Sequence, residues 1–150
     1  MRRRDGSRPR PGATRLRRFW QLGALALAFA SLYPAAALTW VYWHTAHSGL
    51  PGGRHGPRDA YRHALASGFV AFTLSPDLVA AVSALTEGNS PSGRMDRQNN
   101  AIGADLGAQA QSLTELRSRV LQAVASGQIE ASDPHQMTWL PRENWSERPF

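Results

Sequence analysis

The sequence contains no cysteine. Disulfide bonds are therefore excluded, and so are cysteine nucleophiles and the cysteine-rich sites that hold structural zinc. Lysine is absent too, so all 17 basic residues are arginine. The nucleophile motif G-x-S-x-G, the zinc motif H-E-x-x-H and the EF-hand calcium loop are also missing. Several common routes to hydrolysis and metal binding are thus closed to this chain.

An excess of positive charge is missing from most of the chain, although the net charge is +6. Residues 1–43 hold eight arginines and one acid, whereas residues 44–150 hold nine arginines and ten acids. The basic pI therefore comes from the N-terminal tail. Nucleic-acid binding needs basic residues clustered on the folded domain, so we expect no nucleic-acid partner.

Charge of either sign is missing between Phe19 and Trp43. At a rise of 1.5 Å per residue, a helix of this length crosses the roughly 30 Å hydrocarbon core of a bilayer. Trp20 lies near one end of the run, and Trp40, Tyr42 and Trp43 lie at the other. This aromatic pattern is typical of a spanning helix. The sequence therefore predicts a transmembrane signal anchor at residues 19–43, with the lipid bilayer as its partner; it identifies no protein partner.

The arginines before this run predict its orientation. Residues 1–18 are rich in Arg, Pro and Gly, and we expect a disordered tail that stays in the cytoplasm. The rest of the chain would then lie in the bacterial periplasm, anchored by a single span in the inner membrane. The alternative is a cleaved signal peptide, because Pro34 precedes three small residues that end at Ala37. Cleavage there would leave a periplasmic or secreted protein.

The fold class predicted for the remainder is all-α, a small bundle of about four helices. Residues 44–57 are rich in Gly and Pro and predict a linker. The helical domain covers residues 58–127, with Ser75 and Ser112 as candidate N-caps for the second and fourth helices. We expect the second helix to be mostly buried. Residues 128–150 predict an extended tail that packs on the domain, with Trp139 as its main anchor.

Two of the expected helices carry a polar stripe where a small domain normally has an apolar one. Positions 59, 62 and 63 share one face of the first helix, and positions 96, 99, 100 and 103 share one face of the third. A further acid ends the helix between them. Together these side chains form the candidate site: Asp59, Arg62, His63, Glu87, Asp96, Asn99 and Asn100.

Three interpretations of this cluster stay open. In the structural one, the groups satisfy one another and cap helix ends, because buried polar groups without partners are costly. In the hydrolytic one, His63 is a general base oriented by Asp59 or Asp96, while Arg62 and Asn99 stabilise an anion. In the metal interpretation, a divalent ion is bound by oxygen atoms and one imidazole. Its candidate ligands are Asp59, His63, Glu87 and Asp96.

The order D-x-x-R-H, a helix ending in Glu, then M-D-x-x-N-N-x-x-G resembles the DUF6973-like family of small bacterial domains of unknown function. The residues that carry the resemblance are Asp59, Arg62, His63, Glu87, Met95, Asp96, Asn99, Asn100 and Gly103. It covers about residues 57–127. The resemblance implies an exported bacterial domain but no settled activity. One departure is Thr86, which stands before Glu87 where the family pattern has His.

The function we expect from the sequence is a structural or binding role in the bacterial envelope. The alternative is a hydrolase-like domain that acts on an envelope lipid or a cell-wall substrate. No cofactor is required by either, although a divalent metal is compatible with the candidate residues. The sequence does not decide whether the protein is an enzyme.

Overall fold

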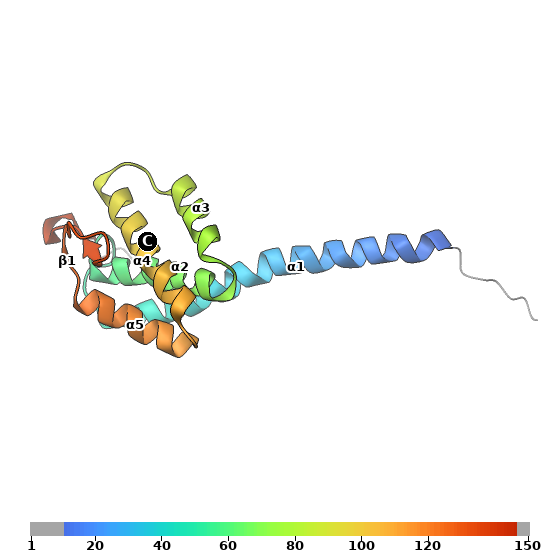
Figure 1. Cartoon of the computed structure of the whole chain (residues 1–150), viewed down its shortest axis with the longest axis horizontal. Helices are drawn as coiled ribbons and strands as arrows, with labels where there is room; N and C mark the ends of the chain where they lie inside the picture. The colour runs from blue at the N-terminus through green and yellow to red at the C-terminus, as the bar shows by residue number, and fades with distance from the viewer. Residues whose placement is uncertain (1–10, 147–150) are drawn as a thin grey trace, which may run out of the picture. The chain divides into compact units, whose positions relative to one another are not determined.

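The computed structural model describes residues 11–146 and confirms the all-α class. Its five α-helices within that range are α1 (Pro11–Ala46), α2 (Pro57–Thr73), α3 (Pro76–Thr86), α4 (Pro91–Gln109) and α5 (Leu113–Ala125) (Figure 1). Two short strands, β1 (Gln128–Ile129) and β2 (Thr138–Trp139), pair in parallel after α5. A single 3-10 turn, Arg142–Asn144, follows them.

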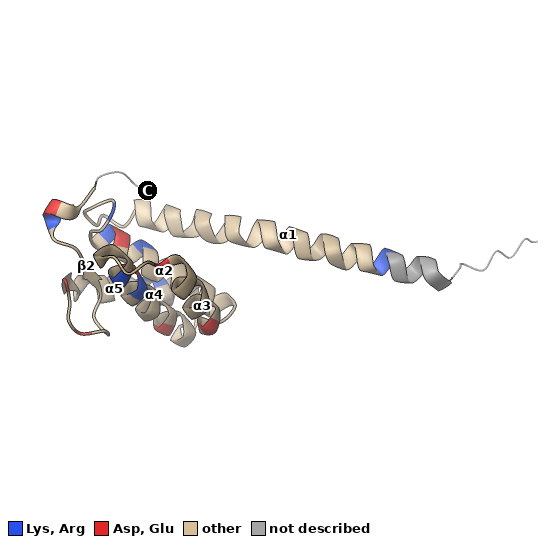
Figure 2. Ribbon diagram, turned by 90° about the horizontal axis from the view of Figure 1, so that it is seen from above, with Lys and Arg blue, Asp and Glu red and all other residues tan. Residues whose placement is uncertain are grey.

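The chain forms two compact units that divide after Ala36, within α1. The N-terminal unit contains the apolar part of this helix, which carries no charged residue beyond Arg18 (Figure 2). Residues Arg17–Ala46 are long and apolar enough to cross a membrane, judged by length and composition. The helix already begins at Pro11, inside the segment expected to be disordered. Residues 1–10 of that segment lie outside the described residues.

The second unit begins at Ala37, earlier than the sequence predicts. Residues 44–46 are the last turn of α1 and not part of a linker. Val41 is only 1% exposed and belongs to the main hydrophobic core. The apolar residues after position 37 thus belong both to the candidate span and to the folded domain. Composition alone does not show where one ends and the other begins.

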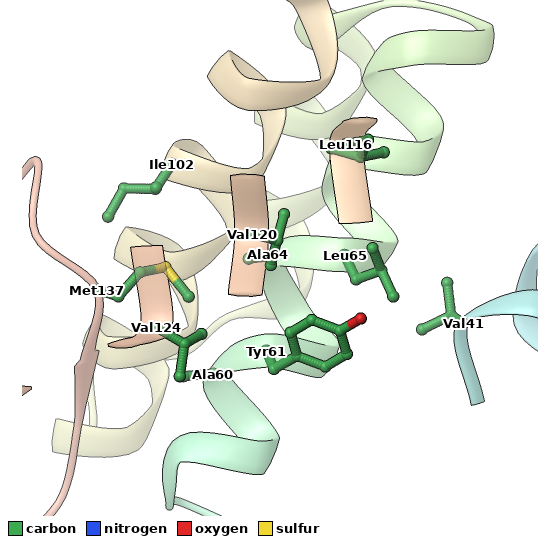
Figure 3. Close-up of a cluster of buried hydrophobic side chains, with 10 residues drawn as sticks. All are labelled: Val41, Ala60, Tyr61, Ala64, Leu65, Ile102, Leu116, Val120, Val124 and Met137. Carbon is green, nitrogen blue, oxygen red and sulfur yellow. The ribbon is translucent and has the colours of Figure 1, made fainter. Parts of the chain in front are cut away.

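The core of the second unit is centred on α2. Its small and apolar residues pack against the apolar face of α5 and against Ile102 of α4 (Figure 3). On α5 this face is formed by Leu116, Val120 and Val124, which recur at intervals of about one helical turn. Met137 closes the core from the segment before β2 and is 1% exposed. Trp139, the expected anchor of the tail, is only half-buried, so Met137 lies deeper.

Helix boundaries agree with the capping signals in the sequence. Ser75 accepts a hydrogen bond from Asp77 N at the start of α3, and Ser112 accepts one from Glu115 N at the start of α5. Both predicted N-caps are therefore confirmed. A proline occupies the first turn of α2, α3 and α4, where its missing N–H costs nothing.

The prediction that the second helix is mostly buried is wrong. In α3 only Val79 and Ser83 are buried. Leu85 is 87% exposed, and Leu78 and Val82 are also exposed. The reason is that α3 packs through one narrow stripe onto α2 and α4, so its apolar composition exceeds what that contact covers.

The contact between α2 and α4 depends on small residues. Gly103 and Gly107, one turn apart on α4, lie directly against the backbone of Ala64 and Gly68 on α2. A Cβ atom at Gly103 would overlap the Ala64 carbonyl oxygen, and one at Gly107 would overlap that of Gly68. A Cβ at Gly68 would lie 2.9 Å from the Gly103 oxygen. Because the neighbours are backbone atoms, they cannot rotate away.

This geometry predicts that Gly103→Ala separates α2 from α4. Overpacking in a core typically costs about 1–3 kcal/mol, and we expect a loss of about 2–3 kcal/mol in the free energy of unfolding. Denaturant unfolding of the full chain in detergent micelles, followed by tryptophan fluorescence, measures it. Gly88→Ala is the matched control, since a Cβ there meets nothing within 4 Å. Equal stability of the two variants would contradict the close-packing argument.

Candidate functional site

Asp59 is fixed at the start of α2. Its side chain is 2% exposed, and Oδ2 accepts a hydrogen bond of 2.6 Å from His55 N, just before the helix. A carboxylate in the first turn also interacts favourably with the helix dipole. Its Oδ1 forms an ion pair with Arg62 Nη2, one turn further along α2. The structural interpretation therefore accounts for Asp59 and part of Arg62.

His63 occupies the centre of the cluster, and its ring is held from both sides. Nδ1 lies 3.3 Å from Asn100 Oδ1 on α4. Nε2 lies 3.3 Å from Arg62 Nη2, 3.3 Å from Asp96 Oδ1 and 3.7 Å from Asp59 Oδ1. The side chain keeps 20% of its surface exposed. His63 is therefore the point at which groups from α2 and α4 meet.

The surroundings of Asn100 assign the tautomer of His63. Asn100 Nδ2 donates to Ser83 Oγ at 3.2 Å and faces Glu87 Oε1 at 3.5 Å, while Oδ1 accepts from Ser67 Oγ at 2.9 Å. An amide oxygen can only accept, so His63 Nδ1 must donate to it. In the neutral ring the lone pair is then on Nε2. Asn100 thus leaves Nε2 as the basic atom of the cluster.

Asp96 is the member of the cluster with the fewest partners. Its side chain is 14% exposed, and with a neutral His63 ring no residue in the range 11–146 donates a hydrogen bond to its buried Oδ1; Asp59 Oδ1 accepts none either but is ion-paired with Arg62. Burial raises the pKa of the Asp96 carboxyl to about 6; the His63 ring acts in the opposite direction, whereas Asp59 and Glu87 add repulsion. Burial without a hydrogen-bond donor destabilises the charged form of a carboxyl group.

The structure brings together three of the four candidate metal ligands. One ligand atom from each of Asp59, His63 and Asp96 lies within 4.8 Å of the others. Glu87, the fourth candidate, contacts the amide of Asn100 and is not in this group. Arg97 holds the loop after Glu87 by donating to the carbonyl oxygens of Glu87 and Gly88 at 2.8 and 2.6 Å.

Asn99 does not join the cluster. Its side chain is fully buried and forms two hydrogen bonds with the backbone of Thr138 in β2, at 2.8 and 3.0 Å. Neighbours on a helix point about 100° apart, so Asn99 and Asn100 serve different partners. Asn99 shares a stripe with Met95 and Ile102, a sequence signal that places it in the core. It binds the C-terminal segment and stabilises no anion at His63.

Sequence reasoning missed two buried serines that complete the site, Ser67 and Ser83. Both bond to the Asn100 amide. Ser67 follows His63 by four residues and Ser83 precedes Glu87 by four, so each lies on the same helix face as a candidate residue. That spacing is the signal that would have identified them.

A pocket opens beside the cluster within the second unit. Its volume is about 360 Å³, and it is lined by Leu38, Val41, Tyr42, Arg54, Arg62, His63 and Ala66. Two of the candidate site residues, Arg62 and His63, therefore border a space large enough for a small ligand.

Comparison with known protein families, with curated proteins and with solved structures finds no match to this chain. The resemblance to the DUF6973-like family stays a prediction from the residues that carry it.

The raised pKa of Asp96 predicts a pH dependence of stability. A carboxyl whose pKa is higher in the folded state favours folding at low pH, and this contribution is lost as the pH rises through about 6. We expect the unfolding free energy of the wild type to fall by up to about 3 kcal/mol between pH 4 and pH 7. Asp96→Asn should abolish this fall. Urea unfolding at both pH values measures the difference between wild type and variant. Asp105→Asn, an exposed carboxyl on α4, should behave as wild type; the same pH slope in all three proteins would refute the assignment.

Proposed function

We propose that this chain is a membrane-anchored envelope protein whose second unit carries a hydrolytic site, with His63 as its general base. The observation that carries the proposal is the state of the His63 ring. Asn100 binds Nδ1 and leaves the Nε2 lone pair beside Asp96 and Arg62, and the ring borders an open pocket. A histidine base oriented through its other nitrogen is an arrangement found in general-base catalysis.

The chemistry that fits these residues is hydrolysis of an ester by an activated water. Nε2 takes a proton from water while the water oxygen bonds to the electrophilic atom. The bond to the leaving oxygen then breaks, and that oxygen receives the proton from the imidazolium. Asp96 is mostly ionised at pH 7, since its pKa is about 6, and its charge stabilises the imidazolium. Arg62 supplies a positive charge for the developing anion.

A non-enzymatic structural or binding role in the envelope is the competing function. Its support is the share of the cluster that already serves the fold: Asp59 receives the His55 backbone N–H, and Asn99 binds the Thr138 backbone. It leaves the buried Oδ1 of Asp96 unexplained, because a structural network gains stability only when its members have partners. For this reason the hydrolytic proposal is preferred.

The proposed location is the periplasmic face of a bacterial inner membrane. The arginines before the apolar run favour a cytoplasmic N-terminus. Cleavage near Ala37 is the alternative, and it would release the second unit with the end of α1 still attached. Val41, which is buried in the core of that unit, lies beyond the cleavage point.

The hydrolytic proposal predicts that His63→Ala abolishes turnover. General-base catalysis contributes roughly 10²–10⁴-fold, so we expect product release to fall at least 100-fold. The assay uses the full chain in micelles with phospholipid and cell-wall fragments as substrates and detects products by mass spectrometry. His135→Ala, an exposed histidine of the C-terminal segment, is the control. Equal rates in the two variants, or no turnover by wild type on either substrate class, would contradict the proposal.

Binding of a divalent cation at Asp59, His63 and Asp96 is the second candidate. The three ligand atoms within 4.8 Å and the donor-free oxygen of Asp96 favour it. The imidazole fits as well, because a metal-binding histidine usually donates its other N–H to an oxygen. The guanidinium of Arg62 opposes it, since its charge already lies beside Asp59 Oδ1 and His63 Nε2.

Removing that charge separates the two candidates. If the cluster binds a cation, Arg62→Gln should tighten the binding of Mn²⁺ and Asp96→Asn should weaken it at least tenfold, both measured by titration with paramagnetic detection. Asp105→Asn controls for loss of an acid elsewhere on α4. Identical affinities in the wild type and all three variants would exclude a metal site at these residues.

A further inference from the structure

The pocket beside His63 has two chemically different sides. Arg54 and Arg62 contribute positive charge, that of Arg62 shared with Asp59, and none of the described residues that line the pocket is acidic. Leu38 and Ala66 contribute apolar surface, and Tyr42 adds an aromatic ring; Val41 also borders the pocket but is only 1% exposed. A ligand that satisfies both sides must carry an anionic group next to an apolar one.

Arg54 is placed at the pocket by its backbone. Its N–H donates to Ser146 O at 2.8 Å, and Ser146 N donates to Arg54 O at 3.3 Å, which forms an antiparallel bridge. The side chain is exposed, and its guanidinium makes no hydrogen bond or ion pair with residues 11–146. The backbone is therefore fixed while the charge stays available to a ligand. A guanidinium is well suited to phosphate, which it binds through two parallel hydrogen bonds.

The apolar side comes from the end of the candidate membrane span. Leu38, Val41 and Tyr42 all belong to the last nine residues of the segment Arg17–Ala46. Trp40 and Trp43 are their neighbours in the sequence, and aromatic residues at the end of a spanning helix mark the level of the lipid headgroups. One wall of the pocket is therefore formed by residues close in sequence to the end of the candidate span, the level expected for phospholipid phosphates.

We propose that this pocket binds the phosphate headgroup of a membrane phospholipid, with the phosphate between Arg54 and Arg62 and the glycerol region against Leu38 and Tyr42. The inference rests on the proposed function, for which it names the substrate class. His63 lies on the same pocket wall as Arg62, so a bound phosphate group is next to the proposed base.

The size and lining of the pocket favour a lipid over a soluble anion. A volume of about 360 Å³ is at the lower end of the roughly 300–1,000 Å³ of ligand pockets. It accommodates a headgroup, while the acyl chains remain in the bilayer. A free phosphate ion would leave the apolar wall without a partner, and an uncharged lipid would leave the Arg54 guanidinium without one.

The test measures binding to the full chain in dodecyl maltoside micelles by isothermal titration calorimetry. The probes are dihexanoyl phosphatidylglycerol, the phosphate-free dihexanoylglycerol, glycerol 3-phosphate and inorganic phosphate. We expect phosphatidylglycerol to bind at least tenfold more tightly than the other three. Arg54→Gln should weaken its binding at least tenfold, and Leu38→Asp should do the same by making the apolar wall acidic.

Arg142→Gln is the matched control, because Arg142 is exposed and outside the pocket. It should bind phosphatidylglycerol as the wild type does. Equal affinities of Arg54→Gln and Arg142→Gln overturn the proposal. So does binding of dihexanoylglycerol as tight as that of phosphatidylglycerol, which indicates apolar adsorption. Equally tight binding of inorganic phosphate assigns the site to a soluble ion and also overturns it.

Lipid binding and turnover, both measured on the wild type, keep this inference distinguishable from the proposed function. Binding without turnover in the wild type would overturn the hydrolytic function and leave the lipid site standing. Turnover of cell-wall fragments without lipid binding would overturn the lipid site and leave the hydrolytic function standing.

Discussion

The close contact between α2 and α4 is the constraint on which the site depends. Gly68, Gly103 and Gly107 let the two backbones approach until carbonyl oxygens occupy the space that Cβ atoms would fill. Only at that separation do short side chains from opposite helices reach one another. The His63–Asn100 hydrogen bond at 3.3 Å joins α2 to α4, and Asp96 Oδ1 lies 3.3 Å from the other nitrogen of the same ring. A helix pair separated by ordinary side chains at 8–10 Å would need longer groups to make the same contacts.

The same contact explains why the polar groups divide into two sets. Asp96 and Asn100 lie on the face of α4 that contacts α2, whereas Asn99 lies on the adjacent stripe and contacts β2. Asn99 satisfies both the N–H and the C=O of Thr138, so it fixes the segment after α5 without entering the site. Asn100 instead satisfies only side chains, among them Ser67 and Ser83. Two neighbouring asparagines thus separate the stabilisation of the fold from the organisation of the site.

Local signals in the sequence were enough for the helices and for the pairing of the two polar stripes. Serine caps, first-turn prolines and spacing of three and four residues are short-range properties, and they located α2 to α5 within a few residues, whereas α1 begins well before the expected span. Long-range packing was not accessible in this way. The exposure of Leu85 on α3, the depth of Met137 and the role of Val41 in the core each depend on which elements meet. The glycines of α4 could have been read as a close helix contact, but only once α2 was known to be the partner.

Most residues of the cluster stabilise the fold, but Asp96 does not. Asp59 has a backbone donor and a cation, and Asn100 has a partner for each of its polar atoms, so these residues stabilise the fold. Asp96 contributes a buried oxygen without a donor, and its pKa near 6 means that its ionisation at neutral pH opposes folding. An apolar or amide side chain would avoid that cost. The proposed proton transfer or cation binding would give this carboxylate, which faces a histidine nitrogen beside an open pocket, a role that packing does not.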